Sequence, residues 1–159
     1  MTKEKTEGLS ELLERGQKAA QRLAPATDKL TETIAQIERA LTEQRFGSSA
    51  SIELSSDTEY DDETGYPIYM EFAALAFRKE GKTWRLMIDS GIAGEPDTWT
   101  SSPLINASRE LRMLAVDRLP GLVAALVDDA EKRITEVEAK QATADALLAT
   151  LKRRAGGTP

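Results

Sequence analysis

The sequence of 159 residues contains no histidine and no cysteine. Without cysteine the chain can form no disulfide, thiol nucleophile or thiolate metal site. Without histidine it lacks the base of Ser-His-Asp and Cys-His catalysis and the commonest ligand of zinc, copper and non-haem iron. These two absences exclude several large classes of enzyme and metal site before any pattern in the chain is considered.

Long hydrophobic runs are lacking as well. The longest, Leu119 to Val127, is interrupted by Pro120 and Gly121, whereas a transmembrane helix needs about 20 apolar residues. The first eight residues have no apolar core of the kind found in signal peptides. We therefore predict a cytoplasmic protein without membrane contact, and its length fits one ordinary domain.

Two zones of the chain show the period of a long amphipathic helix. In residues 9–45, alternating steps of four and three residues meet eight apolar side chains at ten positions: Leu9, Leu13, Gly16, Ala20, Leu23, Thr27, Leu30, Ile34, Ile37 and Leu41. The zone 121–154 repeats the pattern with one polar member, Gln141: Val123, Val127, Ala130, Ile134, Val137, Gln141, Ala144, Leu148 and Leu151. This spacing predicts helices that lie against other helices as in a coiled coil. Pro25 and Pro120 predict a kink or a break in each helix.

Between the two helical zones the pattern alternates every two residues, as is typical of strands. Residues 50–55 predict a short half-exposed strand, while residues 66–77 and 83–89 predict a hairpin whose connection contains Gly81. The longer arm of this hairpin is apolar on both faces, so we expect it in the middle of a sheet that is covered on both sides. Residues 91–103, which contain glycine and proline, predict a connection, with Ser101 or Ser102 capping the helix that follows.

These patterns together predict an α+β fold: a long kinked N-terminal helix, a three-stranded antiparallel sheet and a long kinked C-terminal helix with coiled-coil-like packing. We expect residues 9–154 to form one helix–sheet–helix domain, helical at 9–45 and 103–154 and β-rich at 48–91, and residues 1–8 and 155–159 to be disordered. The helices would be about 55 and 51 Å long, which favours antiparallel pairing within or between chains. We expect a homo-oligomer, most simply a dimer.

Negative charge is concentrated in one segment of the chain. The whole sequence has 21 basic and 27 acidic residues and a net charge of -6. Residues 46–77 include no lysine or arginine but seven carboxylates: Glu53, Asp57, Glu59, Asp61, Asp62, Glu63 and Glu71. Such a cluster steers association with a basic partner or imitates nucleic-acid phosphates, and it is also typical of a solvated loop.

The alternation of Asp57, Glu59, Asp61 and Glu63 suggests a weak calcium or magnesium site as a further alternative. An EF-hand, however, requires glycine and glutamate where this sequence has Asp62 and Ile68. We therefore predict no dedicated metal site.

A second candidate surface is the basic tip of the predicted hairpin. The residues that we expect to contact a partner are Asp57, Glu59, Asp61, Asp62, Glu63, Arg78 and Lys79. We do not expect nucleic-acid binding, because the chain as a whole is acidic.

No motif in the sequence indicates catalysis. The chain has no phosphate-binding glycine motif and only eight aromatic residues from which to build a sugar-binding pocket. We therefore predict a protein without enzymatic activity or cofactor, a protein–protein interaction module (adaptor, chaperone-like or regulatory binder) that self-associates through its helical seams. The alternatives are an acidic inhibitor or nucleic-acid mimic that uses residues 53–63, and a weak divalent-cation-binding protein.

Overall fold

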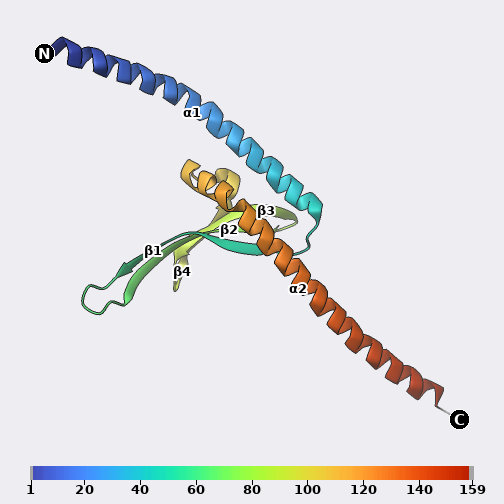
Figure 1. Cartoon of the computed structure of the whole chain (residues 1–159). Coiled ribbons are helices and arrows are strands. Elements are labelled where there is room, and N and C mark those ends of the chain that lie inside the picture. The colour runs from blue at the N-terminus through green and yellow to red at the C-terminus, as the bar shows by residue number, and fades with distance from the viewer. Residues whose placement is uncertain (1, 158–159) are drawn as a thin grey trace.

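The computed structural model describes residues 2–157, and their side chains from Gly8 onward. Along the chain, one long helix precedes the four strands and a second follows them. The elements are α1 (Thr2–Gln44), β1 (Ala50–Tyr60), β2 (Pro67–Glu80), β3 (Thr83–Ile92), β4 (Glu95–Pro103), the 3₁₀ turn η1 (Leu104–Asn106) and α2 (Arg109–Gly156). Figure 1 shows a central body from which the helices extend in opposite directions. The prediction of an α+β fold with two long helices and an antiparallel sheet is confirmed.

The sheet has four strands in the order β1-β2-β3-β4, and every neighbouring pair is antiparallel. Leu75 lies at its centre, opposite Ile52 of β1 and Ile88 of β3. The prediction of three strands was wrong, because residues 95–103 form β4 and not a connection. A strand at the edge of a sheet needs no apolar face, so β4 lacks the alternation that identifies the other strands.

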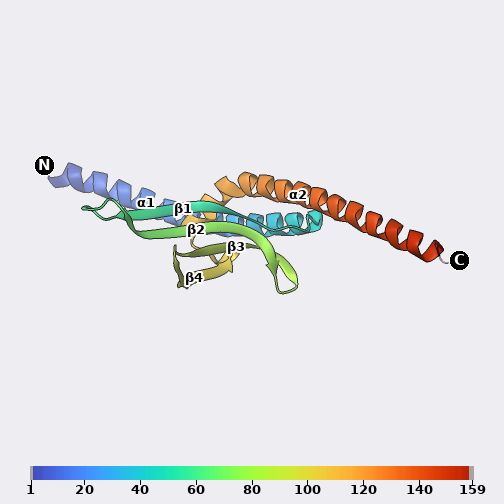
Figure 2. The same ribbon diagram turned by 90° about the horizontal axis from the view of Figure 1, so that it is seen from below.

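The hydrophobic core lies between one face of the sheet and both helices. Alternate residues of the central strands point into it, including the fully buried Leu75 and Leu86. Ile34 of α1 and Leu122 and Leu126 of α2 cover them and are also fully buried. Figure 2 shows the sheet in front of α1, with α2 passing above the strands and no helix in front of them. The helices therefore cover one face of β2, not both.

Both prolines lie inside continuous helices. Pro25 lies within α1 and Pro120 within α2, and neither ends its helix. The second helix begins at Arg109, because the Ser108 hydroxyl oxygen accepts a hydrogen bond from the Leu111 amide at 3.2 Å and so caps the first turn. The cap expected at Ser101 or Ser102 and the helix start expected at 103 were therefore wrong.

The helices also extend further toward the chain ends than we expected. Residues 2–8 belong to α1 and residues 155–156 to α2, where we expected disorder. Residues 1 and 158–159, which share that expectation, lie outside the described part of the chain. Among residues 2–157 no helix has both the length and the apolar character that crossing a membrane requires.

Each helix has one half in the body and one half outside it. Every side chain from residue 8 to residue 26, and every one from residue 131 to residue 157, is exposed. We call residues 2–26 the α1 arm and residues 131–156 the α2 arm. Figures 1 and 2 agree that the arms leave opposite ends of the body. The helices contact each other near the start of α2, where Arg109 Nε donates to Thr27 Oγ1 at 3.0 Å and Arg112 Nη1 donates to Thr31 Oγ1.

Candidate interaction surfaces

The α1 arm carries a line of exposed apolar side chains. Leu9, Leu13 and Leu23 lie on the seam predicted from the sequence, and between 46% and 65% of each side chain's surface is exposed. Leu12, beside this line, is 60% exposed. Helices in proteins gain most of their stability by packing an apolar face against other structure. The arm therefore presents a helix face suited to packing against another helix.

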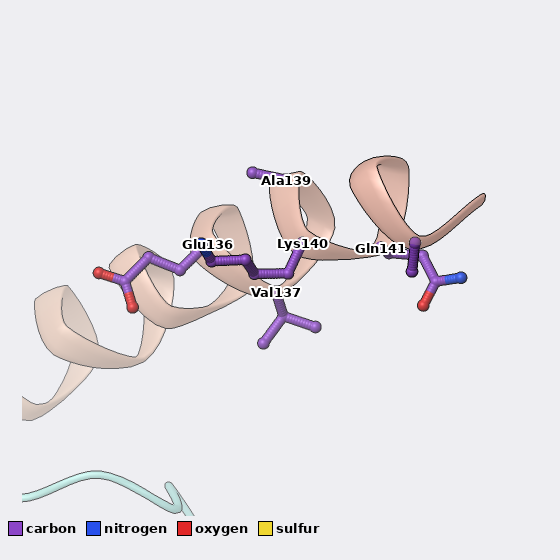
Figure 3. A pocket seen from close by; sticks show the side chains of 6 residues that line it. Glu136, Val137, Ala139, Lys140 and Gln141 are labelled. Carbon is purple, nitrogen blue, oxygen red and sulfur yellow. The ribbon is translucent and has the colours of Figure 1, made fainter. Parts of the chain in front are cut away.

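The α2 arm has the same character. Its exposed apolar residues on the second predicted seam are Ile134, Val137, Leu148 and Leu151, and the exposed Leu147 lies beside this line. A shallow groove between Glu136 and Ala144 is lined by this helix alone. Figure 3 shows Val137 and Ala139 pointing to opposite sides of the helix, so Val137 marks the side of the predicted seam. Arg133, one turn before Val137, forms an ion pair with Asp129 at 2.8 Å.

The acidic residues predicted from the sequence lie on a long hairpin made by β1 and β2. Figure 1 shows that the end of this hairpin projects beyond the other strands. Asp57 faces Glu71 across the two strands, and Glu59 faces Tyr69. Two carboxylates in directly opposed positions repel each other. The surface near Asp57 therefore favours a cationic partner over a neutral one.

The turn of this hairpin is organised by Asp61. Its carboxylate Oδ1 accepts hydrogen bonds from the Glu63 amide at 2.9 Å, the Thr64 amide at 2.7 Å and the Thr64 hydroxyl at 2.9 Å. The Thr64 amide, the Thr64 hydroxyl and the Glu63 amide lower the pKa of Asp61 because each bond favours the charged form. Asp61 therefore holds the turn together, while Asp62 and Glu63 remain exposed to a partner.

The two basic candidates lie at the other end of β2. Arg78 is eleven residues from the first residue of that strand, which corresponds to about 36 Å at 3.3 Å per residue. Lys79 is exposed beside it. The structure therefore does not bring the seven predicted residues together: five lie on the acidic hairpin and two lie at the far end of the sheet.

Arg78 is held by other residues of its own chain. Its Nη1 lies 2.5 Å from Asp89 Oδ2, its Nη2 lies 2.9 Å from Asp89 Oδ1, and its Nε lies 2.6 Å from Glu80. Ser101 of β4 donates to the same Asp89 at 2.5 Å. The hydrogen bonds to Asp89 raise the pKa of Arg78 further above its usual range. Burial alone would raise the pKa of Asp89, but the bonds from Arg78 and Ser101 outweigh it and the pKa is lowered.

An aromatic pair on the helix-free face was missed in the sequence. Phe72 and Trp99 contact edge to face, with ring centroids 5.4 Å apart, and the Trp99 indole donates to the Ile92 carbonyl at 2.8 Å. Trp99 is nevertheless 55% exposed. Its place beside Phe72 depends on β4, which was predicted to be a connection.

Metal binding gains no support from the arrangement of the carboxylates. Among residues 8–157, whose side chains the structure describes, no group of three or more acidic side chains is gathered closely enough to hold a metal ion. The acidic side chains of the hairpin are spread along two strands and a turn, and the best placed of them, Asp61, is occupied by the backbone of that turn.

Comparisons with protein-family models, with curated protein sequences and with solved structures give no match to this chain.

Proposed function

We propose that this protein is a non-enzymatic protein–protein interaction module that self-associates through its two helical arms. The observation that carries the proposal is the pair of exposed apolar seams on the α1 and α2 arms, because from residue 8 to 26 and from 131 to 157 every side chain is exposed. Burying one leucine, isoleucine or valine side chain is worth about 1.5–3 kcal/mol. A partner helix on each arm would therefore gain substantial free energy without any change in the body.

The body of the protein is a scaffold in this proposal. The sheet and the inner halves of the helices share one core, which fixes the places from which the arms extend. The arms themselves form no part of that core. Changes on an arm should therefore alter association without unfolding the body, and the two effects can be measured separately.

The test is a matched pair of substitutions on the α2 arm. Val137→Asp places a charge on the apolar line, and Ala139→Asp places the same charge on the opposite side of the same helix. Light scattering of the unaltered chain should give a mass above 17.4 kDa, the mass of one chain. Val137→Asp should reduce the mass and Ala139→Asp should not. A mass of one chain for the unaltered protein at micromolar concentration would refute the proposal.

A second candidate function is recognition of a basic partner by the acidic hairpin. The observation in its favour is that Asp62 and Glu63 are exposed in a turn that Asp61 holds in one shape, with Tyr60 and Tyr66, also exposed, on either side. Rigid presentation of charge and aromatic surface together favours a specific interface over a merely solvated loop. This function is compatible with self-association, because the hairpin and the arms are separate.

A lysine-rich peptide is a suitable probe for the hairpin. Its binding should weaken as salt is raised, since exposed charges are screened over about 8–10 Å at physiological ionic strength. The double variant Asp62→Asn with Glu63→Gln should bind the peptide more weakly. The control, Glu95→Gln with Asp97→Asn, removes the same charge from exposed residues at the start of β4. Equal loss of binding in both variants would mean that net charge alone is recognised.

A further inference from the structure

We infer that two copies of this chain associate about one two-fold axis, so that the α1 arm of each copy pairs antiparallel with the α2 arm of the other. This inference rests on the proposed function and names the partner of each arm. Its first basis is the direction of the arms. Because they leave opposite ends of the body, they cannot pair within one chain.

The second basis is closure of the assembly. A two-fold rotation that reverses the long axis of the molecule brings the α1 arm of one copy beside the α2 arm of the other at both ends. All four arms are then used, and the assembly is closed. Pairing α1 with α1 and α2 with α2 would instead join each copy to two different neighbours and produce an open filament.

The third basis is that the arms match in length and register. Outside the body they comprise 25 and 26 residues, from residue 2 to 26 and from 131 to 156. When residue 26 is placed beside residue 131 and the helices run antiparallel, every seam position from 9 to 23 faces a seam position of the other arm. The facing pairs are Leu23 with Ile134, Ala20 with Val137, Gly16 with Gln141, Leu13 with Ala144, and Leu9 with Leu148.

The composition of these pairs supports the register. Gln141, the single polar residue of the α2 seam, faces Gly16, the single glycine of the α1 seam. Apart from the adjoining residues of its own helix, no atom lies within 4 Å of the position that a Cβ on Gly16 would occupy. Gln141 can therefore lie over the glycine backbone and keep its amide at the edge of the interface. At Leu13 and Ala144, a large side chain faces a small one, as close helix packing requires.

Charge in the part of the arms nearest the body favours the antiparallel direction. In the α1 arm, Glu11 and Glu14 precede Arg15, Lys18 and Arg22, whereas in the α2 arm Glu136 and Glu138 precede Lys152, Arg153 and Arg154. Parallel arms would place acidic residues beside acidic ones and basic beside basic. In this register, Lys18 and Arg22 of α1 lie beside Glu138 and Glu136 of α2, whereas Lys152, Arg153 and Arg154 face positions 3–5, where the sequence has two lysines and one glutamate.

Introduced cysteines test the arrangement directly, because the chain contains none of its own. In the double variant Leu13→Cys with Ala144→Cys, the two facing positions of each arm pair form a disulfide under mild oxidation. The expected product is a covalent dimer on a non-reducing gel. Each single variant alone should give one-chain bands. The control, Leu13→Cys with Ala139→Cys, uses the outer side of the α2 arm and should also remain uncoupled.

The other outcomes separate this inference from the proposed function. A covalent dimer from Leu13→Cys alone or from Ala144→Cys alone would show like arms pairing, and would overturn the arrangement while leaving self-association intact. A ladder of trimers and larger species from the double variant would overturn the closed two-fold. If the unaltered chain has the mass of a single chain by light scattering, the proposed function fails and the arrangement fails with it.

Discussion

The indole of Trp99 occupies the space that a side chain on Gly91 would need. An ideal Cβ on Gly91 would lie 2.5 Å from Cδ1 and 3.0 Å from Cα of Trp99. The second contact is with backbone, so rotation of the indole cannot relieve it. Glycine at this position of β3 therefore allows β4 to approach and allows Trp99 to reach Phe72.

Gly91→Ala should destabilise the fold by about 1–3 kcal/mol, the usual cost of inserting a methyl group into a packed site. Urea unfolding followed by circular dichroism measures the change, and Trp99 fluorescence should shift with it. Gly121→Ala is the control, since its Cβ would meet Ile52 at 3.8 Å, an ordinary contact. The free energy of unfolding of Gly121→Ala should rise by up to about 1 kcal/mol, because alanine favours the helix more than glycine does. Unchanged stability of Gly91→Ala would contradict the close approach of β4.

Asp89→Asn should lower stability by about 1 kcal/mol at pH 7, because it weakens the bonds to Arg78 and Ser101 at a partly exposed site. The pKa of Asp89 is lower in the folded protein than its usual value, which is about 3.9 in an unfolded chain. The stabilisation from its charge is therefore present above about pH 4 and is lost as the pH falls through the folded pKa.

Urea unfolding of both proteins at pH 7 and at pH 3 checks this prediction. The difference in the free energy of unfolding between the unaltered chain and Asp89→Asn should be smaller at pH 3 than at pH 7. Asp97→Asn, an exposed change on the neighbouring strand, should stay within about 0.5 kcal/mol of the unaltered chain at both values. If Asp89→Asn lowers the free energy of unfolding equally at both pH values, the charge of Asp89 is not what stabilises the sheet.

Asp61→Ala should loosen the hairpin turn while leaving the body intact, because the lost hydrogen bonds lie at an exposed end of the sheet. Amide hydrogen exchange measured by NMR should become faster at Glu63 and Thr64, whose amides donate to Asp61. Exchange in β3 should not change. Asp62→Ala, at the next exposed position, provides the comparison and should leave both regions as they are.

Leu122→Ala should lower the free energy of unfolding by about 2–5 kcal/mol, because Leu122 is fully buried in the core between α2 and the sheet. Met113 lies in the same helix but is 56% exposed. The free energy of unfolding of Met113→Ala should therefore stay within about 0.5 kcal/mol of that of the unaltered chain. Thermal unfolding of the two variants at one protein concentration makes the comparison. A similar loss of stability in Leu122→Ala and Met113→Ala would contradict the placement of α2 on the sheet.

The helices and the first three strands could be predicted because their apolar side chains recur with the period of a helix or a strand, in the exposed arms as well as in the buried core. The fourth strand could not, since β4 lies at the edge and Pro96, Gly94 and its serines are typical of a connection. Thr98, Trp99 and Thr100 were the available signal, as all three are residue types that favour strands. Pro25 and Pro120 did not end their helices, because an exposed position tolerates one missing hydrogen bond.

The candidate surfaces were predictable in part. The seams indicated that the helices need partners, but periodicity carries no information on whether a partner lies in the same chain. Arg78 was predicted to face a partner because it lies at the basic tip of the predicted hairpin. Its actual bond to Asp89 depends on the register of β2, β3 and β4, which the sequence does not encode locally.

The outward extension of both helices also determines how the molecule moves through solvent. A compact chain of 159 residues has a radius of gyration of about 15 Å, whereas each arm alone adds about 38 Å of helix at one end. Such a rod-like particle experiences high friction for its mass. Gel filtration should therefore return an apparent mass well above the true one for every assembly, and small-angle scattering should show an elongated profile even when the arms are paired.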